Sequence, residues 1–118
     1  MKNYIYKLNN FRGYEIRRLA ISRISSCLNK KNIDFVFDVG ANTGQFAYDL
    51  RKNHYDGHIL SIEPQAAANA ILNKRAAKFE NWEIMDPLAL GAENTTGVLN
   101  ISRNSVSSSL LSSVQTEH

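Results

Sequence analysis

Residues 33–39 (IDFVFDV) are the stretch that most constrains how this chain can fold. The stretch is apolar on both of its alternating faces and is rich in β-branched and aromatic residues. Such a pattern is typical of a strand that is buried on both sides within a parallel sheet. Because Gly40 and Gly44 follow at once and a helical pattern resumes over residues 45–52, the sequence predicts a strand, a tight loop and a helix in succession.

The alternation of strand and helix patterns continues along the chain. Residues 58–62 predict a second strand, which ends at Pro64 because proline has no N–H to donate. Residues 65–79 contain six alanines and predict a helix. Residues 82–85 predict a third strand, with 88–90 as its candidate continuation, residues 96–102 predict a weaker fourth strand, and 103–118 predict a loop. This order predicts an α/β fold with parallel strands in the spatial order 3-2-1.

An amphipathic helix is predicted over residues 14–30, ahead of the first strand. Its apolar residues recur at three- and four-residue spacing, and they are Ile16, Leu19, Ala20, Ile24, Cys27 and Leu28. Because Cys27 lies on this stripe, we expect it to be a small core residue rather than a reactive thiol.

The N-terminal segment is basic. Residues 1–33 hold eight Lys or Arg residues and a single acidic residue, Glu15. Such a segment can contact an anionic membrane surface or remain a solvated helix face. No aromatic or glycine pattern of a nucleic-acid module follows, so we expect no nucleic-acid partner.

The length of 118 residues suits one small domain, which we divide into the basic helix (1–32) and the α/β part (33–118). No apolar run is long enough to span a membrane, and the N-terminus lacks the apolar core of a secretory signal. The single cysteine, Cys27, cannot form an internal disulfide. These features predict a cytoplasmic protein.

The segment Asp38-Val39-Gly40-Ala41-Asn42-Thr43-Gly44 carries the candidate site. It lies at the carboxyl end of the first predicted strand, where open α/β sheets bind ligands. Gly40 permits a sharp backbone turn, Gly44 permits close approach of helix and ligand, and Asp38 places an anionic acceptor beside the bend. Glu63 follows the second strand 23 residues after Gly40, a position suited to accepting hydrogen bonds from ribose hydroxyls.

The residue types around the loop discriminate among nucleoside ligands. A dinucleotide fold uses a Gly-x-Gly-x-x-Gly pattern to hold a pyrophosphate, and Asn42 stands where its second glycine is required. An acid ahead of the loop instead suits a ligand with an ammonium group. S-adenosylmethionine combines such a group with a sulfonium and a ribose diol. The loop therefore favours S-adenosylmethionine, and a nicotinamide dinucleotide is the disfavoured alternative.

Four segments, taken in order, resemble the FkbM-type methyltransferases. They are residues 38–46 (DVGANTGQF), 61–64 (SIEP), 88–91 (LALG) and 104–110 (NSVSSSL). The resemblance implies a doubly wound, Rossmann-like methyltransferase fold that uses S-adenosylmethionine to methylate a hydroxyl on a sugar, polyketide or other small molecule. Carried over by position, it implies contacts to the cofactor from Asp38, Gly40, Ala41, Asn42, Gly44, Gln45, Glu63 and Pro64, with Glu63 on the ribose hydroxyls.

The later part of that family's pattern is missing from this sequence. Members continue into further strands, including an Asp-Val-Glu-Gly-like segment near the transferred methyl, and nothing similar occurs here. The resemblance therefore predicts an incomplete domain with no assignable catalytic residue and little or no methyl transfer on its own. An apolar strand that lacks one neighbour also predicts self-association.

Two other functions remain open from the residues alone. A noncatalytic nucleoside-binding remnant would use the same loop without group transfer, and a basic-helix interaction module would use residues 1–32. No metal site is predicted, because the turn around Gly57 prevents His54 and His58 from sharing a helix face.

Overall fold

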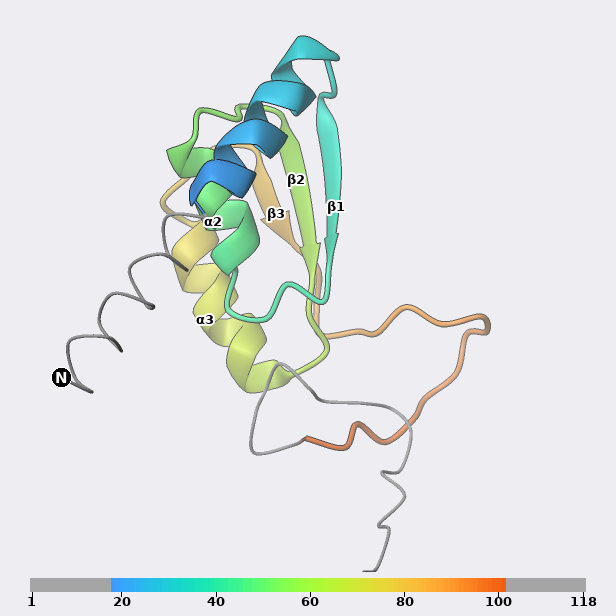
Figure 1. Ribbon diagram of the computed structural model, residues 1–118. Coiled ribbons are helices and arrows are strands. Elements are labelled where there is room, and N and C mark those ends of the chain that lie inside the picture. Colours follow the sequence, from blue (N-terminus) through green and yellow to red (C-terminus); the bar gives the residue numbers. More distant parts are fainter. Residues whose placement is uncertain (1–17, 102–118) are drawn as a thin grey trace, which may run out of the picture.

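The computed structural model describes residues 18–101, which form an α/β arrangement around a three-stranded parallel sheet (Figure 1). In chain order, the elements are a helix described over residues 18–30, β1 (Phe35–Val39), α2 (Gln45–Lys52), β2 (His58–Ile62), α3 (Ala66–Ala76) and β3 (Trp82–Ile84). The predicted loop over 103–118 and the first part of the predicted N-terminal helix lie outside the described residues.

The strand order confirms the arrangement predicted from the sequence. The sheet order is β1-β2-β3, both pairings are parallel, and Val36 lies opposite Ile59. Because crossovers between adjacent parallel strands share one hand, a chain that moves steadily across a sheet places its helices on one face. Figure 1 shows α2, α3 and the N-terminal helix on the same side of the sheet. The described residues therefore form one layer of helices on one layer of sheet.

The core lies between the sheet and these helices. Its fully buried members include Leu50 from α2, Leu72 from α3 and Ile59 from β2, and Trp82 of β3 is buried with them. Tyr55, in the loop before β2, is also fully buried, and its hydroxyl donates to the carbonyl of Ile33 at 3.1 Å. Burial of this apolar surface is the main force that holds the helices on the sheet.

The other face of the sheet is open, contrary to the prediction that the first strand is buried on both sides. Phe35, Phe37 and Val39 on this face are 42%, 65% and 57% exposed. β1 is also an edge strand of the described sheet, paired with β2 alone. Among residues 33–39, only the apolar side chains on the helix-facing side of the sheet are therefore covered by other parts of the described structure.

The N-terminal helix packs through a different stripe from the one predicted. Cys27 is exposed, so the expectation that it is a core residue is wrong. The inward residues are Ile21 and Ser25, with Leu28 half-buried, whereas Leu19 is 58% exposed. These three inward positions are four and three residues apart and so share one helix face.

The chain beyond β3 contains no further strand in its described part. Residues 88–90 and 96–101 are irregular apart from an isolated bridge residue at Asn100, so the predicted continuation and fourth strand are wrong over these residues. Apolar and β-branched residues there, such as Val98 and Ile101, are exposed, and residues 18–101 supply no neighbouring strand against which they could pack.

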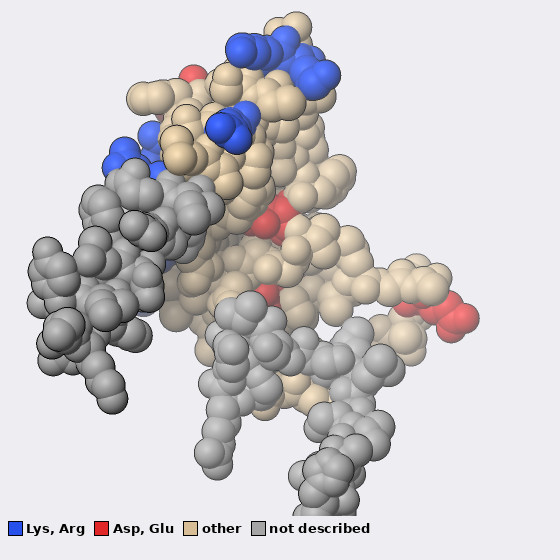
Figure 2. All heavy atoms as spheres, viewed as in Figure 1, with Lys and Arg blue, Asp and Glu red and all other residues tan. Residues whose placement is uncertain are grey.

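Basic side chains gather on the N-terminal helix and at the edge of the sheet where the strands begin (Figure 2). Residues 18–33 contain Arg18, Arg23, Lys30 and Lys31 and no acidic residue. Among residues 18–101, no helix is both long enough and apolar enough to cross a membrane.

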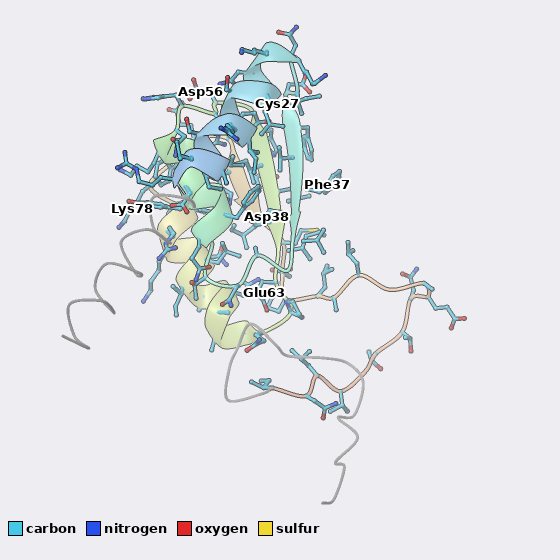
Figure 3. All side chains as sticks on the ribbon, in the orientation of Figure 1. Cys27, Phe37, Asp38, Asp56, Glu63 and Lys78 are labelled. Carbon is cyan, nitrogen blue, oxygen red and sulfur yellow. The ribbon has the colours of Figure 1, made fainter. Side chains whose placement is uncertain are left out.

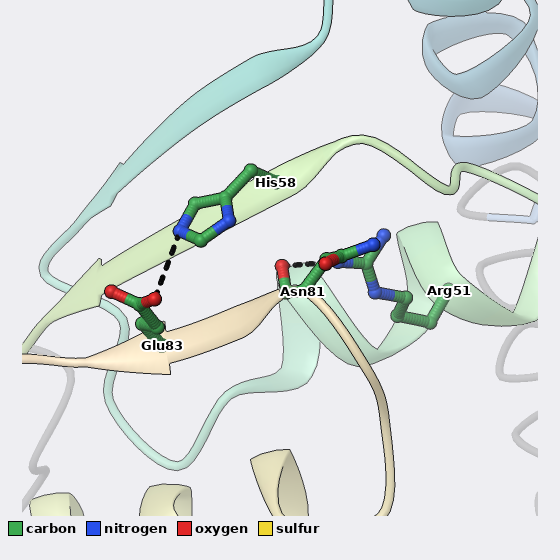
Figure 4. Close-up of polar contacts among 4 residues, drawn as sticks. All are labelled: Arg51, His58, Asn81 and Glu83. Atoms are coloured by element: carbon green, nitrogen blue, oxygen red, sulfur yellow. Dashed lines mark hydrogen bonds and ion pairs between the residues drawn. The ribbon is translucent and has the colours of Figure 1, made fainter.

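Arg51 ties the end of α2 to this edge of the sheet. Its guanidinium donates to the carbonyl oxygens of Tyr55 and of Asn81, the latter at 2.6 Å (Figure 4). An open depression of about 370 Å³ lies beside it, lined also by Asp56 and residues 78–81. On the open face nearby, Nε2 of His58 lies 3.7 Å from Oε1 of Glu83 on the adjacent strand (Figure 4).

Candidate functional site

The candidate site lies at the edge of the sheet opposite Arg51, where β1 and β2 end. The strand pairing runs to Val39 opposite Ile62, so the loop after β1 and the residues after β2 leave the sheet side by side. Figure 3 shows Asp38 on the helix side of the sheet and Glu63 beside the loop that follows β1. The structure thus places at one edge of the sheet the two carboxylates that the sequence singled out.

The loop at residues 40–44 is folded tightly by three residues with positive φ. These are Gly40 (φ 73°), Asn42 (φ 52°) and Gly44 (φ 88°), of which only Asn42 has a side chain, and asparagine tolerates this conformation. The sharp turn predicted at Gly40 is confirmed. A Cβ atom on Gly40 would meet nothing within 4 Å, so its role is conformational.

Most backbone N–H groups of this loop are already bonded within the protein. Those of Gly40 and Ala41 both donate to the carbonyl of Ile62, at 2.9 and 3.0 Å, and that of Gly44 donates to Ala41 at 2.9 Å. The N–H of Asn42 donates to Oε2 of Glu63 at 2.8 Å. A pyrophosphate site needs such groups directed at the ligand. The N–H groups of Gly40, Ala41, Asn42 and Gly44 are therefore not directed at a pyrophosphate.

Gly44 is the N-cap of α2 and lies at a point of close packing. A Cβ atom there would lie 2.6 Å from Cδ1 of Leu72 and 3.2 Å from the ring of Trp82. The close approach that this glycine permits is therefore to α3 and β3. Its predicted contact with a ligand stays a prediction.

Asp38 is a buried carboxylate held by a hydroxyl. It is 8% exposed, and Oγ of Ser61 on β2 donates to its Oδ2 at 3.0 Å. Ser61 in turn accepts a hydrogen bond from Nε1 of Trp82 on β3 at 2.9 Å. Burial raises the pKa of Asp38 above its ordinary value of 3.8, and the bond from Ser61 opposes that rise. The cost of burying this charge is thus only partly offset.

Replacing Asp38 with asparagine is expected to stabilise the folded chain at pH 7, by about 0.5–2 kcal/mol. A carboxyl whose pKa is higher in the folded state favours folding below its unfolded pKa and loses that contribution as pH rises through the folded pKa. The amide of D38N keeps an acceptor for Ser61 and carries no charge. Urea unfolding measures the gain, which should vanish near pH 3, where Asp38 is protonated. A D38N protein less stable than wild type at pH 7 would contradict this account.

Glu63 links the loop to the start of α3. It is 4% exposed, its Oε2 accepts from Asn42, and its Oε1 accepts the N–H of Gln65 at 2.8 Å. The backbone carbonyl of Glu63 accepts from Nδ2 of Asn69 at 3.1 Å. The Glu63 carboxylate therefore joins the loop after β1, through Asn42, to the residues that lead into α3, through Gln65. The sequence did not predict this structural role.

The other predicted site residues differ in their exposure. Ala41 is buried, Pro64 is half-buried, and Gln45 is the exposed first residue of α2. Sequence reasoning missed Ser61 as the partner of Asp38 and Trp82 as the donor to Ser61. The available signal was a small polar residue, Ser61, within the otherwise apolar stretch of β2.

The charge around the site is acidic. No Lys or Arg occurs between residues 32 and 50 or between 53 and 73, the segments that contain the loop and both carboxylates. In the described part of the chain, no group of three or more His, Cys, Asp or Glu residues is arranged to hold a metal ion. The arrangement suits a ligand that presents cationic and hydroxyl groups rather than phosphate.

Searches against protein-family models, curated proteins and solved structures find no match to this chain.

Proposed function

We propose that this chain contains the cofactor-binding part of an S-adenosylmethionine-dependent methyltransferase that acts on a hydroxyl group of a small molecule. The observation that carries the proposal is the pair of buried carboxylates, Asp38 and Glu63, at the ends of adjacent parallel strands. Between them lies a glycine loop whose N–H groups are largely bonded within the chain. Ligands of open α/β sheets bind at this edge.

The chemistry of S-adenosylmethionine fits this set of residues at two points. Its amino acid end carries an ammonium group, which a carboxylate such as that of Asp38 can pair with. Its ribose carries two hydroxyls. Each oxygen of Glu63 accepts one backbone N–H and has capacity for a second donor, so a ribose hydroxyl can be added without breaking those bonds.

When bound, the cofactor supplies a sulfonium-linked methyl group that an acceptor oxygen displaces in line. The residues of this chain would bind and orient the amino acid and ribose ends, so that the methyl is presented in a fixed direction. Positioning of this kind can supply a large part of a rate enhancement. We assign no general base, because the position of the acceptor oxygen relative to the described side chains is not defined.

The proposed fold is the first half of a doubly wound, Rossmann-like domain. Helices on one face and the order β1-β2-β3 agree with such a half. The open face with Phe35, Phe37 and Val39 is where a doubly wound domain would place its second helix layer.

Calorimetric titration with S-adenosylhomocysteine, which keeps the ammonium and ribose groups, tests the proposal. Wild type is expected to bind, and D38N to bind at least about tenfold more weakly, because truncating one member of a buried charge pair is costly. E83Q serves as a matched control, since it removes an exposed carboxylate from the other face and should leave affinity unchanged.

Three outcomes are informative. Absence of binding to folded wild type would refute the proposal. Tighter binding of a nicotinamide dinucleotide than of S-adenosylhomocysteine would favour the dinucleotide alternative. Binding without methyl transfer to any hydroxylated acceptor would favour a noncatalytic nucleoside-binding protein with the same site.

A further inference from the structure

We propose that Ser61 and Trp82 are positioning residues that fix one oxygen of the Asp38 carboxylate and leave the other to pair with a cationic group of the ligand. The identity of that ligand rests on the proposed function. The positioning itself rests on contacts within the protein, so the two can be tested separately.

The direction of the hydrogen bonds follows from the atoms involved. The indole N–H of Trp82 can only donate, so Oγ of Ser61 must be its acceptor at 2.9 Å. A serine hydroxyl has a single proton, and that proton is then directed at Oδ2 of Asp38, 3.0 Å away. The chain of bonds therefore runs one way, from Trp82 through Ser61 to Asp38.

The Ser61 hydrogen bond stabilises the ionised form of Asp38 relative to the neutral acid, because a hydroxyl donates a stronger hydrogen bond to a carboxylate oxygen than to a neutral carbonyl oxygen. Burial acts in the opposite sense and raises the pKa of Asp38, and the hydrogen bond from Ser61 opposes that rise. The other carboxylate of the site, Glu63, follows β2, and its two oxygens accept backbone N–H groups of Asn42 and Gln65.

The three residues are rigidly placed because each sits on a different strand. Asp38 is paired with Ser61 between β1 and β2, and Trp82 is paired with Ile59 between β2 and β3. Ser61 is fully buried, and Trp82 is buried in the core. Among the described residues, Asp38 accepts its side-chain hydrogen bond on Oδ2, and Oδ1 is the oxygen that we assign to the ligand.

The test combines S61A, which removes the hydroxyl, with S61T, which retains it in a residue suited to strands. Carboxyl carbon NMR follows the titration of Asp38 without any ligand. We expect its titration midpoint to rise in S61A and to stay near the wild-type value in S61T. In W82F, where the hydroxyl can turn freely, we expect a smaller rise.

Affinity for S-adenosylhomocysteine, measured from pH 5 to 8, provides the second readout. We expect S61A to bind about tenfold more weakly, with the acidic limb of its pH profile displaced in the same direction as the Asp38 titration. S61T should restore both properties. A merely structural role would lower stability without moving either profile.

The two proposals fail in different ways. An unchanged Asp38 titration in folded S61A would overturn the positioning role, whether or not the ligand binds. A displaced titration in a protein that does not bind S-adenosylhomocysteine would support the positioning role and refute the proposed function. An unchanged titration in W82F would remove Trp82 from the proposal.

Discussion

Gly44→Ala is expected to destabilise the folded chain by about 2–4 kcal/mol, the sum of a conformational cost and an overpacking cost. The conformational cost arises because Gly44 has φ 88°, a region in which a Cβ atom is strained. The overpacking cost arises because the new methyl would lie 2.6 Å from Leu72 and 3.2 Å from Trp82. Both neighbours belong to the buried core and cannot swing into solvent.

Gly40→Ala is the matched control for this prediction. Gly40 also has positive φ, at 73°, but its added Cβ would meet nothing within 4 Å. Only the conformational cost of about 1–2 kcal/mol remains. Urea unfolding followed by circular dichroism compares the two variants. Equal losses of stability in G40A and G44A would show that packing against α3 and β3 contributes nothing at Gly44.

Elements with strong local signals were predicted closely from the sequence. The helix over 45–52 and the strand over 58–62 occur with the predicted bounds, because a glycine precedes each of them and their apolar spacing has a clear period. The loop between β1 and α2 was predicted for the same reason. Its left-handed residues include Gly40 and Gly44, and few other residue types permit that backbone.

Features decided by tertiary contacts were not predictable in this way. The stripe of the N-terminal helix that faces the core contains Ser25 in place of Cys27, and the buried Ser25 hydroxyl has no hydrogen-bond partner within residues 18–101. Periodicity identifies apolar faces, but the neighbouring elements decide which face is covered. The same limit applies to β1, whose apolar residues on the open face have no covering layer among the described residues.

The sequence predicted the two carboxylates of the candidate site but not their hydrogen-bond partners. Asp38 and Glu63 were identified from their positions at strand ends, and the structure places both there. Their long-range partners lie 21 and 23 residues away along the chain, Asn42 for Glu63 and Ser61 for Asp38. Such pairings depend on strand register, which a single sequence does not determine.

Glu63→Gln is expected to destabilise the chain by about 1–3 kcal/mol, opposite in sign to the effect expected for Asp38→Asn. The two substitutions are chemically alike, since each replaces a buried carboxylate with its amide. They differ because both oxygens of Glu63 accept backbone N–H groups, from Asn42 and Gln65, at 2.8 Å each. A glutamine has one acceptor oxygen, so its NH₂ group must face one of those donors.

Hydrogen exchange identifies the site of this loss. In E63Q, the amide of Asn42 or of Gln65 should exchange faster, because one of these two N–H groups is left without an acceptor. E83Q provides the control, since Glu83 is 70% exposed and its amide variant should change stability by no more than about 0.5 kcal/mol. Wild-type stability in E63Q, with unchanged exchange at both amides, would show that Glu63 does not hold the two loops together and would leave ligand binding as its only role.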